Sequence, residues 1–145
     1  MIGLGSQPDE AQAKFLGVIG SWLQLAEPIH REYGFPCGRD VFPTPEEIAP
    51  HLPKWFIDDF AALTEREIME SDWRYFYKSW MWAVEERCWN WWGYERNGDS
   101  LTIQLQVDGW PCPSEELVYL ARVVGADSVV VDGTLVYQSE TNIGD

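Results

Sequence analysis

Hydrophobic positions in the first quarter of the chain recur at steps of three and four residues. Ser6 to Asp9 supplies a helix start, with a serine as the capping candidate, a proline in the first turn and acidic residues near the positive end of the helix dipole. Pro28 is expected to kink or divide this helix, and Gly34 to end it. The residues predicted to share the buried face are Ala11, Phe15, Val18, Ile19, Trp22, Ala26, Ile29 and Tyr33.

Capping signals dominate the next segment. Residues 34–45 are rich in glycine and proline and predict a structured loop. Thr44 to Glu47 then has the pattern of a capping box with proline at the first helical position, and Pro50 and Pro53 keep that helix short. A second capping box at Thr64 to Glu67 follows a helical segment over 54–63. Residues 44–70 therefore predict several short helices.

Seven of the nine tryptophans lie between Trp73 and Trp110, where the apolar period changes. Up to about Arg87 the period is three to four and predicts a helix, with a strand as the competing interpretation because aromatic residues favour sheets. From Cys88 to Val107 the period is two and predicts a β-hairpin.

Asn97-Gly98 is a strong signal for a type I′ hairpin turn. A two-residue turn there predicts the pairs Arg96 with Asp99, Tyr94 with Leu101, Trp92 with Ile103, and Trp91 with Gln104. One face of the hairpin would then carry Trp92, Tyr94, Leu101, Ile103, Leu105 and Val107, and the other Trp89, Trp91, Gly93, Thr102, Gln104 and Gln106.

The last part of the chain predicts a helix and a second hairpin. Ser114 is expected to cap a helix that ends at Gly125, and Asp132-Gly133 to join strands 128–132 and 134–138. Residues 1–5 and 139–145 predict loosely ordered ends. The expected fold is one α+β domain over 1–145, with a helical N-terminal half (6–87) packed on a C-terminal ββαββ antiparallel sheet (88–138).

The segment Asn90-Trp91-Trp92-Gly93, together with Trp110-Pro111-Cys112-Pro113 and the helix after it, resembles a phage- and plasmid-encoded family whose ferredoxin-like domains carry an N-W-G segment and a W-x-x-P turn. The resemblance covers about the last third of the chain. It implies a ferredoxin-like variant of the sheet and an origin in a mobile element. One extra tryptophan interrupts the N-W-G segment, and the family has no settled chemistry, so no site residue carries over.

The net charge of the chain says more about its possible binding partners than its hydrophobicity does. Twenty-four acidic residues stand against ten basic ones, giving a net charge of −14, and the acids are spread along the whole sequence. Such a surface repels nucleic acid and anionic membranes and attracts basic proteins. The alternative is that the charge only keeps an aromatic-rich protein soluble.

Cysteine usage and hydropathy predict a location. The three cysteines are an odd number without CxxC spacing, which predicts reduced thiols rather than a disulfide framework. The sequence predicts neither a signal peptide nor a membrane-spanning segment. A cytoplasmic protein is therefore expected.

Catalytic and metal motifs are scarce. The two histidines, His30 and His51, lack the paired spacing of a metal site, so neither a metal nor another cofactor is predicted. Cys37 follows His30 by seven residues and gives the one nucleophile and base pairing worth naming. Adjacent Glu85 and Glu86 are expected on solvated helix surface. We therefore expect a protein that is not an enzyme.

Two binding hypotheses remain. The first is an acidic inhibitor of a basic, nucleic-acid-acting protein, such as an immunity protein or a phage anti-defence protein, without direct contact to nucleic acid or membrane. Its expected surface consists of Asp58, Asp59, Glu65, Glu67, Glu70, Glu85 and Glu86. The alternative is a carbohydrate or small-ligand binding module on the hairpin face, which would use Trp89, Trp91, Gln104 and Gln106.

Overall fold

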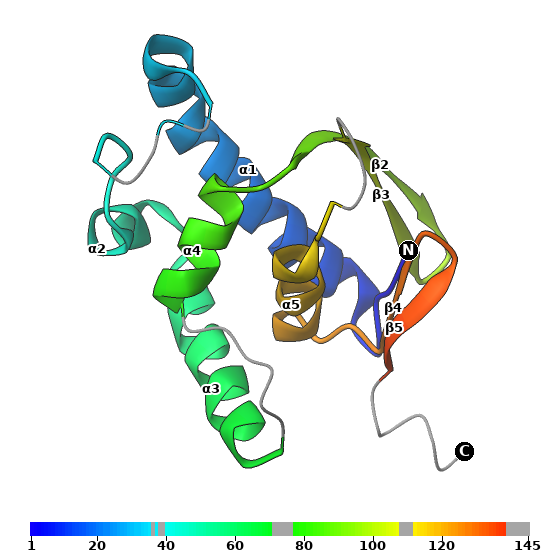
Figure 1. Ribbon diagram of the computed structural model, residues 1–145. Helices are drawn as coiled ribbons and strands as arrows, with labels where there is room; N and C mark the ends of the chain where they lie inside the picture. The colour runs from blue at the N-terminus through cyan, green and yellow to red at the C-terminus, as the bar shows by residue number, and fades with distance from the viewer. Residues whose placement is uncertain (36, 38–39, 71–76, 108–111, 139–145) are drawn as a thin grey trace. The chain divides into compact units, whose positions relative to one another are not determined.

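The computed structural model describes residues 1–35, 37, 40–70, 77–107 and 112–138, except for the side chains of residues 63–70 and 77–79. The chain divides into two compact units, one of residues 1–15 and 87–145 and the other of residues 16–86. The sheet belongs to the first unit and most of the helical residues to the second (Figure 1). The fold is α+β, as the sequence predicts.

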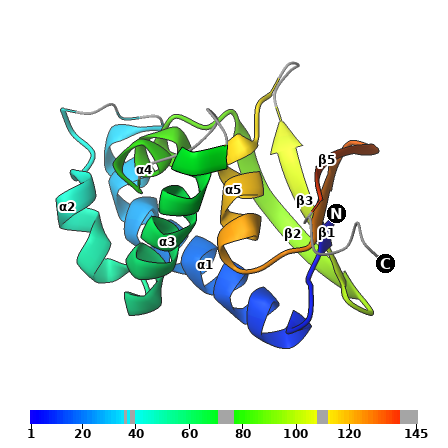
Figure 2. The same cartoon turned by 90° about the horizontal axis from the view of Figure 1, so that it is seen from below.

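The sheet has five strands, all paired antiparallel with their neighbours. Their order is β2 (Trp89–Asn97), β3 (Ser100–Val107), β1 (Ile2–Gly3), β4 (Ser128–Val131) and β5 (Thr134–Gln138). Helix α5 (Glu115–Val123) lies alongside this sheet (Figure 2). The predicted ββαββ elements are all present, but the two hairpins are separated by a strand that the sequence pattern did not predict.

That extra strand comes from the start of the chain and corrects the expectation that residues 1–5 are loosely ordered. Ile2 pairs with Leu101 of β3 on one side and with Val129 of β4 on the other. Ile2 and Leu4 are both buried. Two residues are too few to show the period of a strand, so the sequence of residues 1–5 does not predict β1. Its role becomes clear only from its pairing with β3 and β4.

The first hairpin turns one residue later than predicted. Asn97 pairs with Ser100, so the two turn residues are Gly98 and Asp99. Gly98 has a φ of +59°, whereas the described residues with positive φ do not include Asp99. A positive φ at the first turn position alone is the pattern of a type II′ turn, which glycine favours. The predicted pairing of Arg96 with Asp99 is therefore wrong, and Arg96 pairs with Leu101.

A β-bulge between Trp91 and Gly93 then changes the faces of the hairpin. Trp91 pairs with Leu105 and Trp89 with Val107, so both indoles share the face of the apolar residues of β3. Trp92, predicted on that inner face, is the extra residue of the bulge and is 70% exposed. The alternation of β3 is as predicted, but the faces of Trp89, Trp91 and Trp92 are not.

The C-terminal elements agree with the sequence. Val131 pairs with Thr134 across Asp132-Gly133, the predicted two-residue turn, whose φ values of +50° and +82° are those of a type I′ turn. Helix α5 follows Ser114 and stops before Gly125, which has a φ of +96°. Ser114 occupies the N-cap position without a side-chain hydrogen bond to the helix.

Cys88 and Cys112 form a disulfide, with their Cα atoms 5.7 Å apart, and Cys37 is the free cysteine. The prediction of three reduced thiols is therefore wrong. The bond links the residue before β2 to the segment before α5, 24 positions away in sequence. An odd cysteine count does not exclude one bond and one thiol, and only the fold brings these two residues within bonding distance.

Helix α1 (Pro8–Tyr33) is one continuous helix of 26 residues, and the boundary between the units falls inside it after Phe15. Pro28 does not divide it, since a proline removes one backbone hydrogen bond and the flanking turns keep theirs. Gly34 follows with a φ of +89°, as a C-terminal glycine should. Of the predicted stripe, Tyr33 is exposed and Ile29 half-buried, and the other six residues are buried.

The segment after α1 contains fewer helix breaks than predicted. The capping box of Thr44 and Glu47 starts α2 (Pro45–Ile48) as expected, and a short 3₁₀ turn, η1 (Ala49–His51), follows. Helix α3 (Lys54–Glu70) then runs through Thr64, so the second capping box does not restart a helix. Helix α4 (Tyr77–Glu85) confirms the helical interpretation for its residues, while Trp73 to Phe76 lie outside the described part of the chain.

Aromatic rings fill the centre of the helical unit. The indole of Trp80 lies 5.1 Å from Phe56, 6.0 Å from Phe60 and 6.2 Å from Trp22, measured between ring centroids. All four side chains are at most 1% exposed. These contacts join α1, α3 and α4 around one core. Within the described residues, no helix has both the length and the apolar character required to cross a membrane.

Candidate functional site

The predicted acidic surface is partly retained. Asp58 and Glu86 are exposed and Asp59 is half-exposed. Glu85 is fully buried, which corrects the expectation that it lies on solvated helix surface. The side chains of Glu65, Glu67 and Glu70 lie outside the described part of the chain, although their backbone belongs to α3.

The negative charge is shared evenly between the two units. The sheet unit has eleven acidic and four basic residues, and the helical unit thirteen and six, so each carries −7. Among the side chains that the structure describes, the buried acidic ones are Glu85 and Glu116. The acidic character is thus a property of the surface of both units.

The predicted ligand-binding face of the hairpin does not exist as one surface. Trp89 and Trp91 share a face with Leu105 and Val107, whereas Gln104 pairs with Gly93 and Gln106 with Asn90 on the opposite face. Trp89 is buried and Trp91 half-buried. The two indoles and the two amides therefore cannot contact one ligand as predicted.

Trp89 instead makes a buried polar contact. Its indole Nε1 donates a hydrogen bond to the carboxylate of Glu116 on α5, which is 4% exposed. Burial raises the pKa of Glu116 above its ordinary value, and the hydrogen bond from Trp89 opposes that rise. This contact joins the first hairpin to α5 and makes Trp89 part of the core.

A cavity of about 270 Å³ opens on the same face of the sheet. Residues of α1, β3 and α5 line it, among them Phe15, Leu105 and Leu117, together with Trp89. The helix that begins at Pro8 thus helps to cover the hairpin face that carries Trp89. The lining is largely aliphatic and aromatic, which does not suit a carbohydrate.

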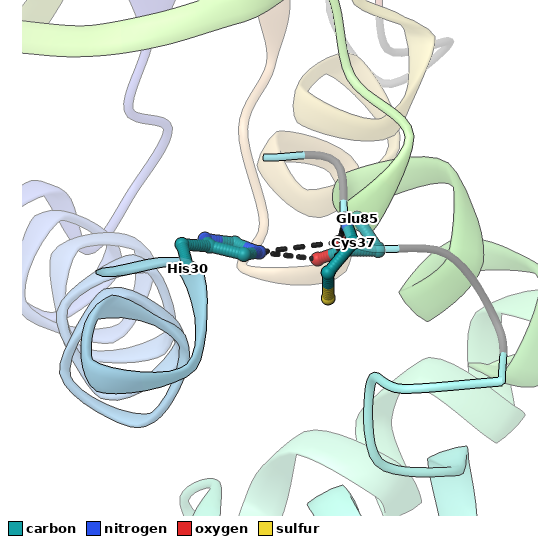
Figure 3. A network of polar contacts seen from close by, with 3 residues as sticks. All are labelled: His30, Cys37 and Glu85. Carbon is teal, nitrogen blue, oxygen red and sulfur yellow. Dashed lines mark hydrogen bonds and ion pairs between the residues drawn. The ribbon is translucent and has the colours of Figure 1, made fainter. Parts of the chain in front are cut away.

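The helical unit brings together three groups that the sequence analysis did not combine. His30 comes from the last turn of α1, Cys37 from the loop that follows, and Glu85 from the end of α4 (Figure 3). The imidazole Nε2 lies 2.8 and 3.1 Å from the two carboxylate oxygens of Glu85. The thiol Sγ of Cys37 lies 3.6 Å from one of them, and the backbone N–H of Cys37 donates to the same oxygen over 3.3 Å.

Aromatic rings fix the imidazole of His30. Phe42 stacks on it with 5.4 Å between ring centroids, and Phe35 meets it edge-on at 4.8 Å. Phe42 also stacks on Trp22 of the core at 5.6 Å. The orientation of His30 toward Glu85 is therefore set by packing as well as by hydrogen bonding.

The geometry does not favour Cys37 as a catalytic nucleophile. A base must take the thiol proton, but the hydrogen bond of the Cys37 thiol goes to Glu85 and not to His30, whose imidazole also bonds to Glu85. Burial and the neighbouring Glu85 carboxylate raise the pKa of the Cys37 thiol, so the reactive thiolate is disfavoured. The expectation that the protein is not an enzyme remains a prediction.

The short distance in sequence between His30 and Cys37 was the signal available for this cluster. Glu85 was missed because adjacent carboxylates on a helix are usually solvated. Only the packing of α4 shows that Glu85 points inward and Glu86 outward.

No protein-family model, curated protein or solved structure matches this chain. The residues and their geometry are therefore the basis for any functional conclusion.

Proposed function

We propose that this protein is an acidic inhibitor that binds a basic, nucleic-acid-acting protein, in the manner of an immunity protein or a phage anti-defence protein. The observation that carries the proposal is the charge of −14, divided equally between two units whose described acidic side chains lie at the surface, apart from Glu85 and Glu116. Nothing in this proposal requires a catalytic group.

The physical basis is competition for the positive side chains of the partner. A nuclease holds phosphates with lysine and arginine, and carboxylates on a complementary surface can occupy the same positions. Charge complementarity also raises the rate of association at low salt. The binding should therefore weaken steeply as salt increases.

The proposed surface now consists of Asp58, Asp59 and Glu86, with Glu65, Glu67 and Glu70 included from the sequence. Glu85 is removed from it, because its carboxylate is buried against His30 and Cys37.

A pull-down from host lysate at low and high salt, followed by a nuclease assay on the purified partner, tests the proposal. We expect the full chain to capture a basic protein at low salt and to inhibit its cleavage of nucleic acid. Replacing Asp58 and Asp59 by Asn and Glu86 by Gln should weaken the binding by about tenfold, since each surface charge contributes about 0.5 kcal/mol.

The matched control removes three exposed charges from the other unit, with Glu95 and Glu115 changed to Gln and Asp132 to Asn. This control variant has the same net charge as the first triple variant, but it should bind the partner nearly as well as the wild type does. If no basic protein is captured, or if capture ignores salt, the proposal fails. Equal losses in both variants would show a charge effect without the proposed surface.

Three finer expectations belong to the same proposal. A mobile-element origin and a ferredoxin-like variant of the sheet would agree with an anti-defence role, and they rest on the N-W-G resemblance alone. A cytoplasmic location is proposed from the sequence. The Cys88–Cys112 bond weighs against it, because the cytoplasm keeps most disulfides reduced.

The carbohydrate-binding alternative is not supported, since its four residues lie on opposite faces of the hairpin.

A further inference from the structure

We propose that His30, Cys37 and Glu85 form a binding site for one divalent transition-metal ion, with Zn²⁺ as the ion that fits best. The three ligand atoms lie within 4.8 Å of one another, and all belong to the helical unit. This site goes beyond the proposed inhibitory function and does not depend on it.

Two of the three distances between ligand atoms are near those of a metal centre, and the third, from His30 Nε2 to Cys37 Sγ, is at most 4.8 Å. In a tetrahedral zinc site with bonds of about 2.0–2.3 Å, neighbouring ligand atoms are roughly 3.3–3.7 Å apart. The 3.6 Å between Cys37 Sγ and the Glu85 carboxylate already meets this value. The imidazole Nε2, now 2.8 Å from the carboxylate, has to withdraw by less than 1 Å, roughly, to admit the ion.

The chemistry of the three groups selects the class of metal. On metal binding the Cys37 thiol would release its proton to solvent and bind as a thiolate. A thiolate and an imidazole favour Zn²⁺ and related transition ions over Mg²⁺ and Ca²⁺, which prefer oxygen ligands. Three protein ligands leave the fourth tetrahedral position to water or to another molecule. The site therefore has the composition of an open zinc centre.

The surroundings also favour a cation. Glu85 is 0% exposed, and among the described residues the hydrogen bonds of its carboxylate are to His30 and Cys37. A buried carboxylate is costly without positive charge nearby, and a divalent ion supplies it. The competing explanation is a structural ion pair between Glu85 and a protonated His30, in which the protein takes up no metal.

Cobalt substitution distinguishes the two explanations. The full-length protein is freed of metal with a chelator and titrated with Co²⁺ under nitrogen without added thiol, so that Cys37 stays reduced and the disulfide intact. We expect one Co²⁺ per chain, visible bands of tetrahedral cobalt, and a thiolate-to-cobalt charge-transfer band in the near ultraviolet. Zn²⁺ should displace the cobalt and raise the melting temperature.

Single substitutions at the ligands give the second measurement. Cys37→Ser should abolish the charge-transfer band, and His30→Ala or Glu85→Gln should weaken Co²⁺ binding by at least about tenfold. His51→Ala and Glu86→Gln change an exposed histidine and an exposed carboxylate and should leave binding unchanged. The absence of the charge-transfer band in the wild type, or its persistence in Cys37→Ser, would overturn the proposal. A wild type that binds no metal would establish the structural ion pair.

Discussion

Glu85 and Glu116 are the carboxylates that the described part of the chain buries, and their surroundings differ. Glu85 bonds to an imidazole and a thiol, the set of groups that a metal ion can share. Glu116 accepts a hydrogen bond from the neutral indole of Trp89, and burial raises the pKa of its carboxyl, although hydrogen bonds and the positive charge of Arg87 oppose that rise. A buried glutamate therefore suggests a metal site in the helical unit, at Glu85, and a cost in stability in the sheet unit, at Glu116.

Glu116 makes the stability of the protein depend on pH. Burial raises its pKa in the folded state above the ordinary value of 4.5, so the folded protein binds this proton more tightly than the unfolded chain does. The stability from this group is fully present below pH 4.5 and is lost as the pH rises through the raised pKa. Each unit of pKa difference corresponds to about 1.4 kcal/mol.

Glu116→Gln should remove this loss, because the amide oxygen still accepts the bond from Trp89 and cannot ionise. We expect the stability of the variant relative to the wild type to increase from about pH 4.5 toward neutral pH, measured by urea unfolding at each pH. Glu95→Gln, at an exposed position on β2, is the control and should show a flat difference. A flat difference for Glu116→Gln would contradict the raised pKa.

At the scale of the element, the first hairpin shows how one inserted residue changes the role of its neighbours. The period of two along β3 was correctly predicted, because alternating apolar residues follow from having one buried face. The bulge at Trp91 and Gly93 cannot be seen in that period, and it reverses the faces assigned to three tryptophans. The turn residue Gly98 was recognised, but not its position within the turn.

Trp89 and Trp92 should therefore respond oppositely to truncation. Trp89→Ala removes a buried indole and leaves Glu116 without its donor, so it should cost about 3–5 kcal/mol of unfolding free energy. Trp92→Ala, at a side chain that is 70% exposed, should change it by less than about 0.5 kcal/mol. Urea unfolding measures both changes.

If Trp89→Ala does not fold, Trp89→Phe tests the same point with a smaller cost, since it keeps a ring in the core. The sequence-based register instead places Trp92 on the inner face of the hairpin and Trp89 on the opposite face, so it predicts a large loss for Trp92→Ala. A larger loss for Trp92→Ala than for either Trp89 variant would restore that register and contradict the bulge.

At the scale of the whole molecule, long-range pairing completes the sheet unit. β1 from the start of the chain joins β3 to β4, and the disulfide ties the start of β2 to the start of α5. Both links connect segments whose own sequence gives no sign of a partner. Closing a loop of this length is expected to stabilise the fold by about 3 kcal/mol.

The disulfide can be tested by counting thiols. Protein refolded in air and then denatured without reductant should titrate one thiol, Cys37, and three after reduction. Replacing Cys88 and Cys112 by Ala should lower the unfolding free energy by about 3 kcal/mol. Cys37→Ser serves as the control and should leave no titratable thiol before reduction. Three thiols in the unreduced wild type would contradict the bond.

The sequence by itself determined the elements with a clear period or a chemical start and stop. These include the long first helix, the capping box at Thr44, both hairpins, the helix after Ser114 and the acidic surface, because each depends on neighbouring residues alone. Only the tertiary structure decided which groups meet. It buries Glu85 against His30 and Cys37, joins Cys88 to Cys112 in a disulfide, and places the indole of Trp89 in hydrogen-bonding distance of Glu116. Contacts between segments far apart in sequence depend on packing, which leaves no local pattern to read.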